Sequence, residues 1–394
     1  MFAKLSRNTC FLILISILLL LPGCWSGHEL TDRLIVLGIS LDSVNGKIRL
    51  TLQGILPESF ISSTSTPSSP TGGDQSTFSL LSADGNSVQD AIQKIDKITP
   101  RFLYFGHNAV FFIGEDLAKK GLMPYLDFFA RNQWGQESAW IIIAKGGTGQ
   151  KLLTTTNLLV RYPAMGLEEL VRKHQTQIPT LFKFLLNYHS DSGSQILVNA
   201  IDLKNTDAPA GFQIDQLLLG TSALFQKDKL TGYLDDLDGQ TYEWLKNGFQ
   251  NSRFSFTQVP DPGAPLLSVM LSGDPAVFQV MTSPKLNVRL QVTCDFNVTE
   301  TSTSHLSSPA DIRALENRLD DVLTQRFDQL MTHLQENKAD VFNIAEKVHA
   351  YHLRSWQEVQ DHWPDVYAGL PIEIVVNSHF RNSSAMDKYP GLKE

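Results

Sequence analysis

Residues 33–55 read RLIVLGISLDSVNGKIRLTLQGI, which is two apolar runs joined through Asn45-Gly46. Both runs alternate or are rich in β-branched residues, as expected of strands. Asn-Gly between two such runs is a strong short-range signal for a two-residue hairpin turn. The stretch therefore predicts two antiparallel strands close to the start of the folded chain.

Helices and strands are expected to alternate after this hairpin. Asn86 or Ser87 can cap a helix that Pro100 ends. The apolar face of this helix is expected to carry Val88, Ala91, Ile92, Ile95 and Ile98. Further strands are predicted at Phe102–Ile113, Ser138–Ala144 and Ile196–Ile201, and further helices from Glu115-Asp116, from Gln150 and over Leu167–Leu186 with a break at Pro179. This order suggests an α/β sandwich.

The second half is expected to begin after Asn205–Gly211 (NTDAPAG), where Asp, Pro and Gly cluster. Strands are predicted at Leu217–Phe225 and Leu230–Leu234, a short helix at Gln240–Lys246, several antiparallel strands between Arg253 and Val298, a helix at Asp340–Tyr351 and a closing strand at Leu370–Val376. We therefore predict an α+β, multi-domain fold with mixed or antiparallel sheets, each covered by helices.

The clearest helix follows Ser308, a good N-cap, with Pro309 at the first helical position and Asp311 at the third. Its apolar stripe is Ile312, Leu315, Leu319, Val322, Leu323, Phe327, Leu330 and Leu334, and the residues expected to face outward include Arg313, Glu316, Asp320 and Gln325. Such a stripe is typical of a long amphipathic helix packed on a sheet. Pairing with a partner helix in a coiled coil is the alternative.

The predicted domains are a signal peptide at 1–23, an N-terminal domain at 24–204 and a C-terminal domain at 205–394, with a possible division into about 205–300 and 301–394. Ser62–Thr77 is rich in Ser, Thr, Pro and Gly and predicts an exposed loop. The same loop could instead bind a partner.

The amino terminus predicts export. Lys4 and Arg7 precede the short apolar run Phe11–Leu21, which leads into Leu21-Pro22-Gly23-Cys24. A run this short, with basic residues before it, is typical of a secretory signal. Leu21–Cys24 resembles the lipobox of bacterial lipoproteins, which implies that Cys24 carries an S-diacylglyceryl and an N-acyl group. An uncleaved membrane anchor is the alternative, but a span needs about 20 apolar residues.

Charge and cysteine content narrow the function further. The net charge of −8 argues against binding nucleic acid and against adhesion to anionic lipid by charge alone. The lipid on Cys24 would therefore hold the protein at its membrane. With Cys10 removed and Cys24 acylated, Cys294 has no cysteine to pair with, and its strand-like surroundings predict a small buried hydrophobe.

No motif supports catalysis, a cofactor or a metal. Gly146–Lys151 (GGTGQK) follows a strand, but its lysine spacing is wrong for a phosphate-binding loop, so a plain strand-to-helix turn is predicted. His349 and His352 lack further ligands at suitable spacing, and His107 is predicted to be a core or edge histidine. Asp235–Gly239 (DDLDG) lacks the ligand spacing of a calcium loop and predicts a solvated turn.

Several segments together resemble the Ger(x)C spore germination lipoproteins. The opening Cys24-Trp25, Glu29-Leu30 and Arg33–Asp42 resembles the start of that family. His107–Gly121 (HNAVFFIGEDLAKKG) and Ser222–Leu234 (SALFQKDKLTGYL), with Trp244-Leu245 after them, resemble two internal segments. Asp340, Phe342, Trp356 and a closing apolar strand resemble its tail.

The resemblance implies the C subunit of a nutrient germinant receptor. Such a subunit would be non-enzymatic and would lie at the outer face of the cell membrane or spore inner membrane, beside integral A- and B-type subunits. The alternatives are a solute-binding lipoprotein of a transporter, which needs two α/β lobes around a cleft, and a surface hydrolase, for which no motif is present. Neither the germinant nor the partner surface follows from the sequence.

Overall fold

The chain was analysed as a computed structural model that describes residues 30–56, 78–132, 136–154, 162–166, 169, 179–189, 195–205, 215–257, 266–301 and 308–383. The predicted signal peptide, Cys24 and the Ser62–Thr77 loop lie outside these residues, as does most of the helix predicted from Leu167 to Pro179.

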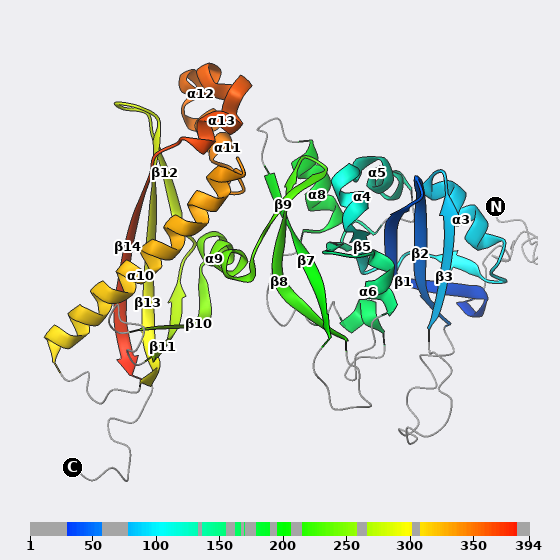
Figure 1. Cartoon of the computed structure of the whole chain (residues 1–394), viewed down its shortest axis with the longest axis horizontal. Helices are drawn as coiled ribbons and strands as arrows, with labels where there is room; N and C mark the ends of the chain where they lie inside the picture. Colours follow the sequence, from blue (N-terminus) through cyan, green and yellow to red (C-terminus); the bar gives the residue numbers. More distant parts are fainter. Residues whose placement is uncertain are drawn as a thin grey trace, which may run out of the picture.

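Two sheets with covering helices lie at opposite ends of an elongated molecule (Figure 1). The strands are β1 (Arg33–Val44), β2 (Lys47–Ile55), β3 (Ser79–Gly85), β4 (Phe102–Tyr104), β5 (Val110–Gly114), β6 (Trp140–Ala144), β7 (Gln195–Asn205), β8 (Asp215–Gln226), β9 (Lys229–Leu234), β10 (Phe249–Thr257), β11 (Leu266–Gly273), β12 (Val277–Met281), β13 (Asn287–Thr301) and β14 (Ile372–Ser383). The α-helices are α3 (Val88–Asp96), α4 (Glu115–Lys120), α5 (Met123–Arg131), α6 (Gly149–Thr154), α8 (Leu181–Tyr188), α9 (Asp236–Asn247), α10 (Pro309–Glu336), α11 (Ile344–Tyr351), α12 (Leu353–Val359) and α13 (Trp363–Ala368).

The first sheet has the order β3-β2-β1-β5-β6-β7-β8-β9, and β4 also pairs with β1. The predicted hairpin is confirmed, because β1 and β2 pair antiparallel around Asn45 and Gly46, both with positive φ. β1, β5, β6 and β7 are parallel neighbours, so their carboxyl ends meet at one edge of the sheet. The apolar residues of β1 and β5 are buried between helices on both faces, as parallel strands require.

Two predictions for the segment after β3 are wrong. Phe102–Ile113 forms two strands instead of one, because a turn interrupts it. His107 lies in this turn and is exposed, instead of lying in a core or at a sheet edge. Helix α3 is capped by Ser87, as expected, but it ends at Asp96. Ile98 therefore lies past the helix with 63% of its surface exposed, instead of on the buried face.

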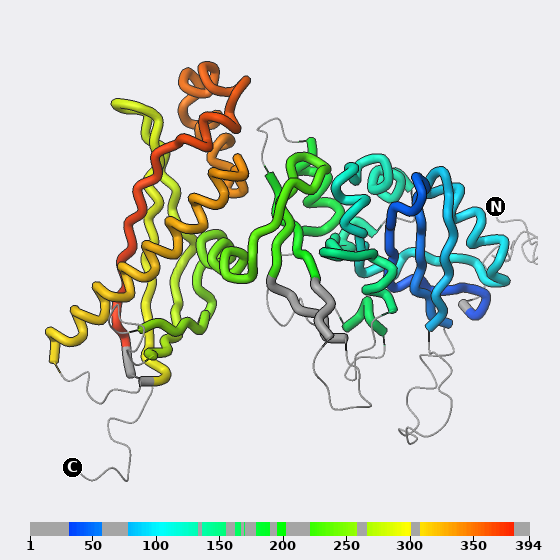
Figure 2. Tube along the Cα trace, in the orientation of Figure 1, coloured from blue at the N-terminus to red at the C-terminus, as the bar shows by residue number. Residues whose placement is uncertain are grey.

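The first sheet continues through the predicted domain boundary. Asn205 and Asp215 are paired residues at the ends of β7 and β8, so the boundary segment connects two neighbouring strands of one sheet. The strands β7–β9 also contribute to two cores. Val198 and Phe225 pack in the core of the first sheet, whereas Leu197 and Leu224 pack in the core of the second half. Figure 2 shows these green strands between the two halves.

Hydrogen bonds reinforce this junction. The side-chain amide of Gln195, at the start of β7, donates to the carbonyl of Lys338 at 2.8 Å, and its backbone N–H donates to the carbonyl of Asp340 at 3.4 Å. Gln195 is only 5% exposed, so these contacts are shielded from water. The two halves are therefore joined by packed side chains as well as by the chain itself.

The second sheet is mixed. β10, β11, β12 and β13 are antiparallel, as predicted, whereas the closing strand β14 pairs parallel with β13. Helix α10 crosses this sheet (Figure 1) and buries the apolar residues Leu315, Leu319, Leu323, Phe327, Leu330, Met331 and Leu334. Ser308 is confirmed as the N-cap, with its Oγ accepting from the Asp311 N–H at 3.2 Å, and the Asp311 carboxylate accepts in return from the Ser308 N–H, which completes a capping box. The α+β, multi-domain fold class is thus as expected.

The outward-facing side of α10 was predicted only in part. Glu316 and Asp320 lie against β14, where their carboxylates accept from the backbone N–H groups of Phe380 at 2.9 Å and Ser378 at 2.8 Å. Among the described strands β14 pairs only with β13, so these amides need acceptors from elsewhere. The prediction that Glu316 and Asp320 face solvent is wrong for this reason.

Two predicted boundaries also shift. The segment Asp235–Gly239 is the start of α9 and not a solvated turn: Asp235 caps the helix at 2.8 Å from the Asp238 N–H, and Asp238 is 7% exposed. Helix α11 begins at Ile344, so Asp340 precedes the helix in which it was predicted. Asp235 and Asp340 each accept hydrogen bonds from backbone N–H groups at the start of a helix.

Candidate functional site at the carboxyl edge of the first sheet

The carboxyl edge of the parallel strands gathers several charged and glycine residues. Asp42 lies near the end of β1, Gly114 ends β5 and Glu115 comes directly after it, and Gly146–Gly149 follow β6. In open sheets with parallel strands, ligands bind in the crevice outside these carboxyl ends. This edge is therefore where a ligand or catalytic site would be expected in the first half.

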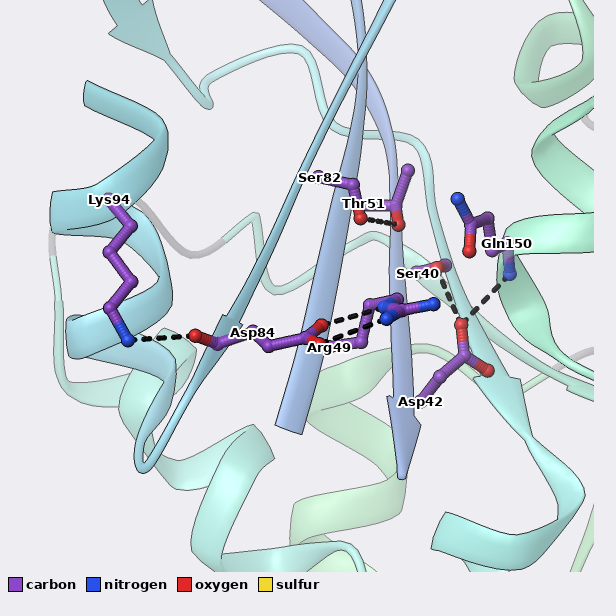
Figure 3. Close-up of polar contacts among 8 residues, drawn as sticks. All are labelled: Ser40, Asp42, Arg49, Thr51, Ser82, Asp84, Lys94 and Gln150. Carbon is purple, nitrogen blue, oxygen red and sulfur yellow. Dashed lines mark hydrogen bonds and ion pairs between the residues drawn. The ribbon is translucent and has the colours of Figure 1, made fainter. Parts of the chain in front are cut away.

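Asp42 is the central residue of this edge (Figure 3). It is 1% exposed, and its Oδ1 accepts from the backbone N–H of Gly149 at 2.6 Å. Its Oδ2 accepts from the N–H of Gln150 and from the hydroxyl of Ser40, both at 3.0 Å. Burial raises the pKa of Asp42, and the two backbone hydrogen bonds oppose that shift. The carboxylate thus takes the place at the start of α6 where a bound anion would lie.

Glycines allow this close approach. A Cβ at Gly149 would lie 2.4 Å from the carbonyl oxygen of Phe112, and a Cβ at Gly114 would lie 2.2 Å from Asp42 Oδ1. By contrast, a Cβ at Gly147 would meet no heavy atom within 4 Å. The Gly-rich segment therefore serves the packing of β1, β5 and α6, which confirms the prediction of a strand-to-helix turn.

Glu115 is the second carboxylate at this edge. It accepts from the backbone N–H of Gly146 and forms an ion pair with Lys119 at 2.5 Å. The hydrogen bond from Lys119 is the largest cause of a lowered pKa for Glu115. The carboxylates of Asp42 and Glu115 thus both accept hydrogen bonds from backbone N–H groups at this edge.

A second polar group extends across the neighbouring strands (Figure 3). Arg49 forms a two-pronged contact with Asp84, with distances of 2.7 and 2.9 Å, and Thr51 and Ser82 share a hydrogen bond at 2.9 Å. Lys94 from α3 donates to the carbonyl of Asp84 at 2.8 Å. These contacts join β2, β3 and α3, and the paired hydrogen bonds of Arg49 with Asp84 are the two-pronged arrangement that arginine commonly makes with a carboxylate.

A third group lies between α9 and α10 in the second half. Asp238 Oδ2 is 2.6 Å from His333 Nδ1, and this contact is the largest cause of a raised pKa for His333. Arg326 donates to the Thr241 hydroxyl at 2.8 Å and lies over the Trp244 ring at 5.2 Å. The group fixes α9 against α10, and the sequence analysis did not identify it.

The tail residues that carried the resemblance form one buried cluster. Asp340, 2% exposed, accepts from the N–H groups of Ile344 at 2.8 Å and Ala345 at 2.7 Å, and from the indole of Trp363 at 3.1 Å. Trp356 packs against Trp363 with ring centroids 5.6 Å apart. The ring of Phe342 packs against the rings of Tyr242 and Phe278 in the core of the second half. These residues organise helices α11–α13.

The remaining residues singled out by the sequence analysis include Cys294 and His349. Cys294 is 1% exposed, as predicted, and burial raises the pKa of its thiol to about 12. His349 is exposed and lies beside the Trp356 ring. Within the described residues, no group of three or more His, Cys, Asp or Glu side chains is arranged to hold a metal ion. No helix in the described part of the chain is both long and apolar enough to cross a bilayer.

Comparisons with known proteins match both halves of the chain. A family model described as the N-terminal domain of spore germination proteins matches residues 26–203. A second, described as "Spore germination B3/ GerAC like, C-terminal", matches residues 220–384. Together the two models cover most of the sequence, with the N-terminal model matching the first half and the C-terminal model the second.

Relatives and a solved structure agree with this match. Spore germination protein KC of Bacillus subtilis (strain 168) is 23% identical over 394 residues, which covers 94% of each chain. Spore germination protein B3 of the same organism is 23% identical over 96% of this chain and 98% of its own. The crystal structure of the GerBC protein has the same fold, with a TM-score of 0.55 at 17% identity over 88% of this chain and 97% of that one. The chain therefore belongs to the GerAC-like family of spore germination proteins, the Ger(x)C family.

Proposed function

We propose that this protein is the lipid-anchored C-type subunit of a nutrient germinant receptor. Its folded body would lie on the outer face of the cell membrane, which corresponds to the spore inner membrane, and would act by contacting the integral A- and B-type subunits. The observation that carries the proposal is the match of both halves to spore germination domains, over residues 26–203 and 220–384.

The amino terminus supports the anchored form of this proposal. Cys24 directly follows Gly23 at the end of a short apolar run with basic residues before it. The family match begins at residue 26, two positions after this cysteine. A diacylglyceryl group together with an N-acyl chain would anchor the protein stably, whereas a single chain binds only marginally.

The described polar groups support a non-enzymatic role. Asp42 and Glu115, the two carboxylates at the carboxyl edge, both accept from backbone amides of the same edge. The alternative role, a solute-binding lipoprotein, is supported by the parallel strands of the first sheet. It would also need a second parallel lobe, and the second sheet is largely antiparallel.

The first experiment replaces the anchoring cysteine. Cys24→Ala is expected to give a folded protein that is released from the membrane fraction and spores that no longer germinate in response to nutrient. Cys294→Ala is the matched control, since it removes the other mature-chain thiol without touching the anchor. Normal germination by spores that carry released Cys24→Ala protein would contradict the proposal.

A second experiment separates the two roles. Membrane extraction followed by purification is expected to recover the integral receptor subunits together with this protein. Calorimetric titration of the purified chain with amino acids and sugars is expected to show no tight binding. Tight binding without co-purified subunits would favour the solute-binding role.

A further inference from the structure

The first sheet ends in an edge strand, β3, that is paired on one side. β3 pairs with β2 along its whole length of seven residues, without a bulge. Among the described strands, only β2 pairs with it (Figure 1). Ser79, Leu80 and Ser82 of this strand are exposed. An edge strand of this kind presents a row of backbone N–H and C=O groups that can bond to a further strand.

Two contacts show which backbone groups face the free side of β3 (Figure 3). Lys94 Nζ donates to the carbonyl of Asp84 at 2.8 Å, so this carbonyl is directed away from β2. The hydroxyls of Thr51 and Ser82, two directly opposite residues, are 2.9 Å apart. Such closeness is typical of opposite residues that exchange no backbone hydrogen bonds. Because these positions alternate along an antiparallel pair, Leu80, Ser82 and Asp84 direct their backbone groups to the free side.

The protein itself occupies only part of this row. Lys94 binds the carbonyl of Asp84, at the end of the strand next to α3. Within the part of the chain that the structure describes, the backbone groups of Leu80 and Ser82 make no hydrogen bond on the free side. The row alternates donors and acceptors in the way that the backbone of a neighbouring strand matches. The ligand that fits this edge is therefore an extended polypeptide.

Other edges of the two sheets carry protection that β3 lacks. The outward N–H groups of β14 are bound by carboxylates of α10, one of them Asp320 at 2.8 Å from the Ser378 nitrogen. β9, at the far end of the first sheet, begins with Lys229 and pairs with β8 through a register shift. Lysines, bulges and covering groups are devices that block edge-to-edge pairing. β3 contains no lysine, proline or bulge, and its one charged residue, Asp84, is paired with Arg49.

An added strand would also meet apolar side chains on one face of the sheet. Leu81 and Ala83 are partly buried and pack on the core that α3 covers. They lie on the opposite face from Leu80 and Ser82, since side chains alternate along a strand. A partner strand with apolar residues at alternate positions would continue this row. A second copy of this chain is disfavoured as the partner, because each copy carries a net charge of −8.

We propose that the free edge of β3 binds an extended strand of another receptor subunit, which joins the first sheet beside Leu80 and Ser82. This inference rests on the proposed function, since the receptor supplies the partner chain. In strand addition of this kind, main-chain hydrogen bonds give affinity and contacts of alternate side chains give specificity. The contact would hold the first half of the folded body against its partner.

A proline substitution tests the backbone contact. Leu80→Pro removes an N–H group that faces the free side, and proline is tolerated at such positions of an edge strand. Leu80→Ala is the matched control, because it removes the same side chain and keeps the N–H group. Both variants are made as full, lipidated chains and extracted from membranes, and the integral subunits that co-purify are quantified. Thermal unfolding followed by circular dichroism checks the fold of each variant.

The expected result is a severalfold lower recovery of integral subunits with Leu80→Pro than with Leu80→Ala. Equal recovery with the two variants would overturn the proposal. Self-association of the purified native chain that Leu80→Pro abolishes would assign the edge to a second copy instead. Native protein that recovers no integral subunits would contradict the proposed function itself, and this inference with it.

Hydrogen exchange adds a measurement that needs no variant. Peptides covering residues 79–85 are expected to exchange severalfold more slowly in the membrane-extracted complex than in the purified chain alone, because a partner strand protects the outward N–H groups. Peptides from β2, which is paired on both sides, are the reference and should exchange equally in the two samples. Equal exchange of residues 79–85 in the two samples would overturn the proposal, even where Leu80→Pro fails to fold.

Discussion

The carboxylate of Asp42 lies 2.6 Å from the backbone nitrogen of Gly149, although 107 positions separate the two residues. This contact joins the end of β1 to the first residue of α6 and is shielded from water. It explains why a glycine-rich segment follows β6 without the lysine spacing of a phosphate loop. The negative charge that such a helix start favours is supplied from within the protein.

Replacing Asp42 tests this contact. Asp42→Ala leaves the buried N–H groups of Gly149 and Gln150 without their acceptor, which is expected to lower the free energy of unfolding by about 1–3 kcal/mol. Urea denaturation followed by circular dichroism measures the change. Asp328→Ala, an exposed change on α10, is the control and is expected to shift stability by about 0.5 kcal/mol or less. Equal stability of the two variants would contradict the structural role of Asp42.

Two glycines of the same segment offer a matched pair. Gly149→Ala would bring a Cβ to 2.4 Å from the Phe112 carbonyl, whereas Gly147→Ala meets no atom within 4 Å. Overpacking of this kind is expected to cost about 1–3 kcal/mol in Gly149→Ala, and Gly147→Ala is expected to remain near the native stability. Thermal unfolding of both variants measures the difference, and a reversed order would show that the packing of α6 on β5 is not as described.

The contact of His333 with Asp238 predicts a pH dependence. The hydrogen bond raises the pKa of His333 in the folded protein above its ordinary value of 6.5. Its contribution to stability is therefore complete below about pH 6.5 and is lost as the pH rises through the folded-state pKa. Urea denaturation from about pH 6 upward is expected to show this decline, which His333→Gln should flatten. His107→Gln, at an exposed turn, should keep the decline, and a slope unchanged by His333→Gln would count against the contact.

The carboxylates along β14 predict local protection. Asp320→Ala removes the acceptor of the Ser378 N–H, so the amide is expected to exchange with solvent faster than in the native protein. Hydrogen exchange resolved along residues 372–383 measures this effect. The neighbouring exposed variant Asp321→Ala should leave the exchange rates of β14 unchanged. Fast exchange at Ser378 in the native protein would show that Asp320 does not protect this strand.

The buried thiol of Cys294 predicts low reactivity. At 1% exposure and with a pKa raised to about 12, it should not react with a thiol reagent in the folded mature protein near neutral pH. Denaturation should release one reactive thiol. Rapid labelling of the native protein would show that the core around β13 opens readily.

Local sequence determined those features whose signals lie within a few residues. The β1–β2 hairpin follows from Asn45-Gly46, and the start of α10 follows from Ser308 and Asp311, because turn geometry and capping depend on neighbouring residues. The apolar stripe of α10 and the buried state of Cys294 follow equally from periodicity and composition. The expectation of an acylated Cys24 also depends on sequence alone.

Tertiary structure alone decided which distant groups meet. Asp42 with Gly149, Asp238 with His333, and Glu316 and Asp320 with β14 are pairings across two or more elements, and no local period encodes them. The continuation of the first sheet past Asn205 has the same cause, since strand pairing joins segments that are separate in the sequence. Exposure of Ile98 likewise depended on where the core ends, because helical periodicity predicts a face but not the residue at which packing stops.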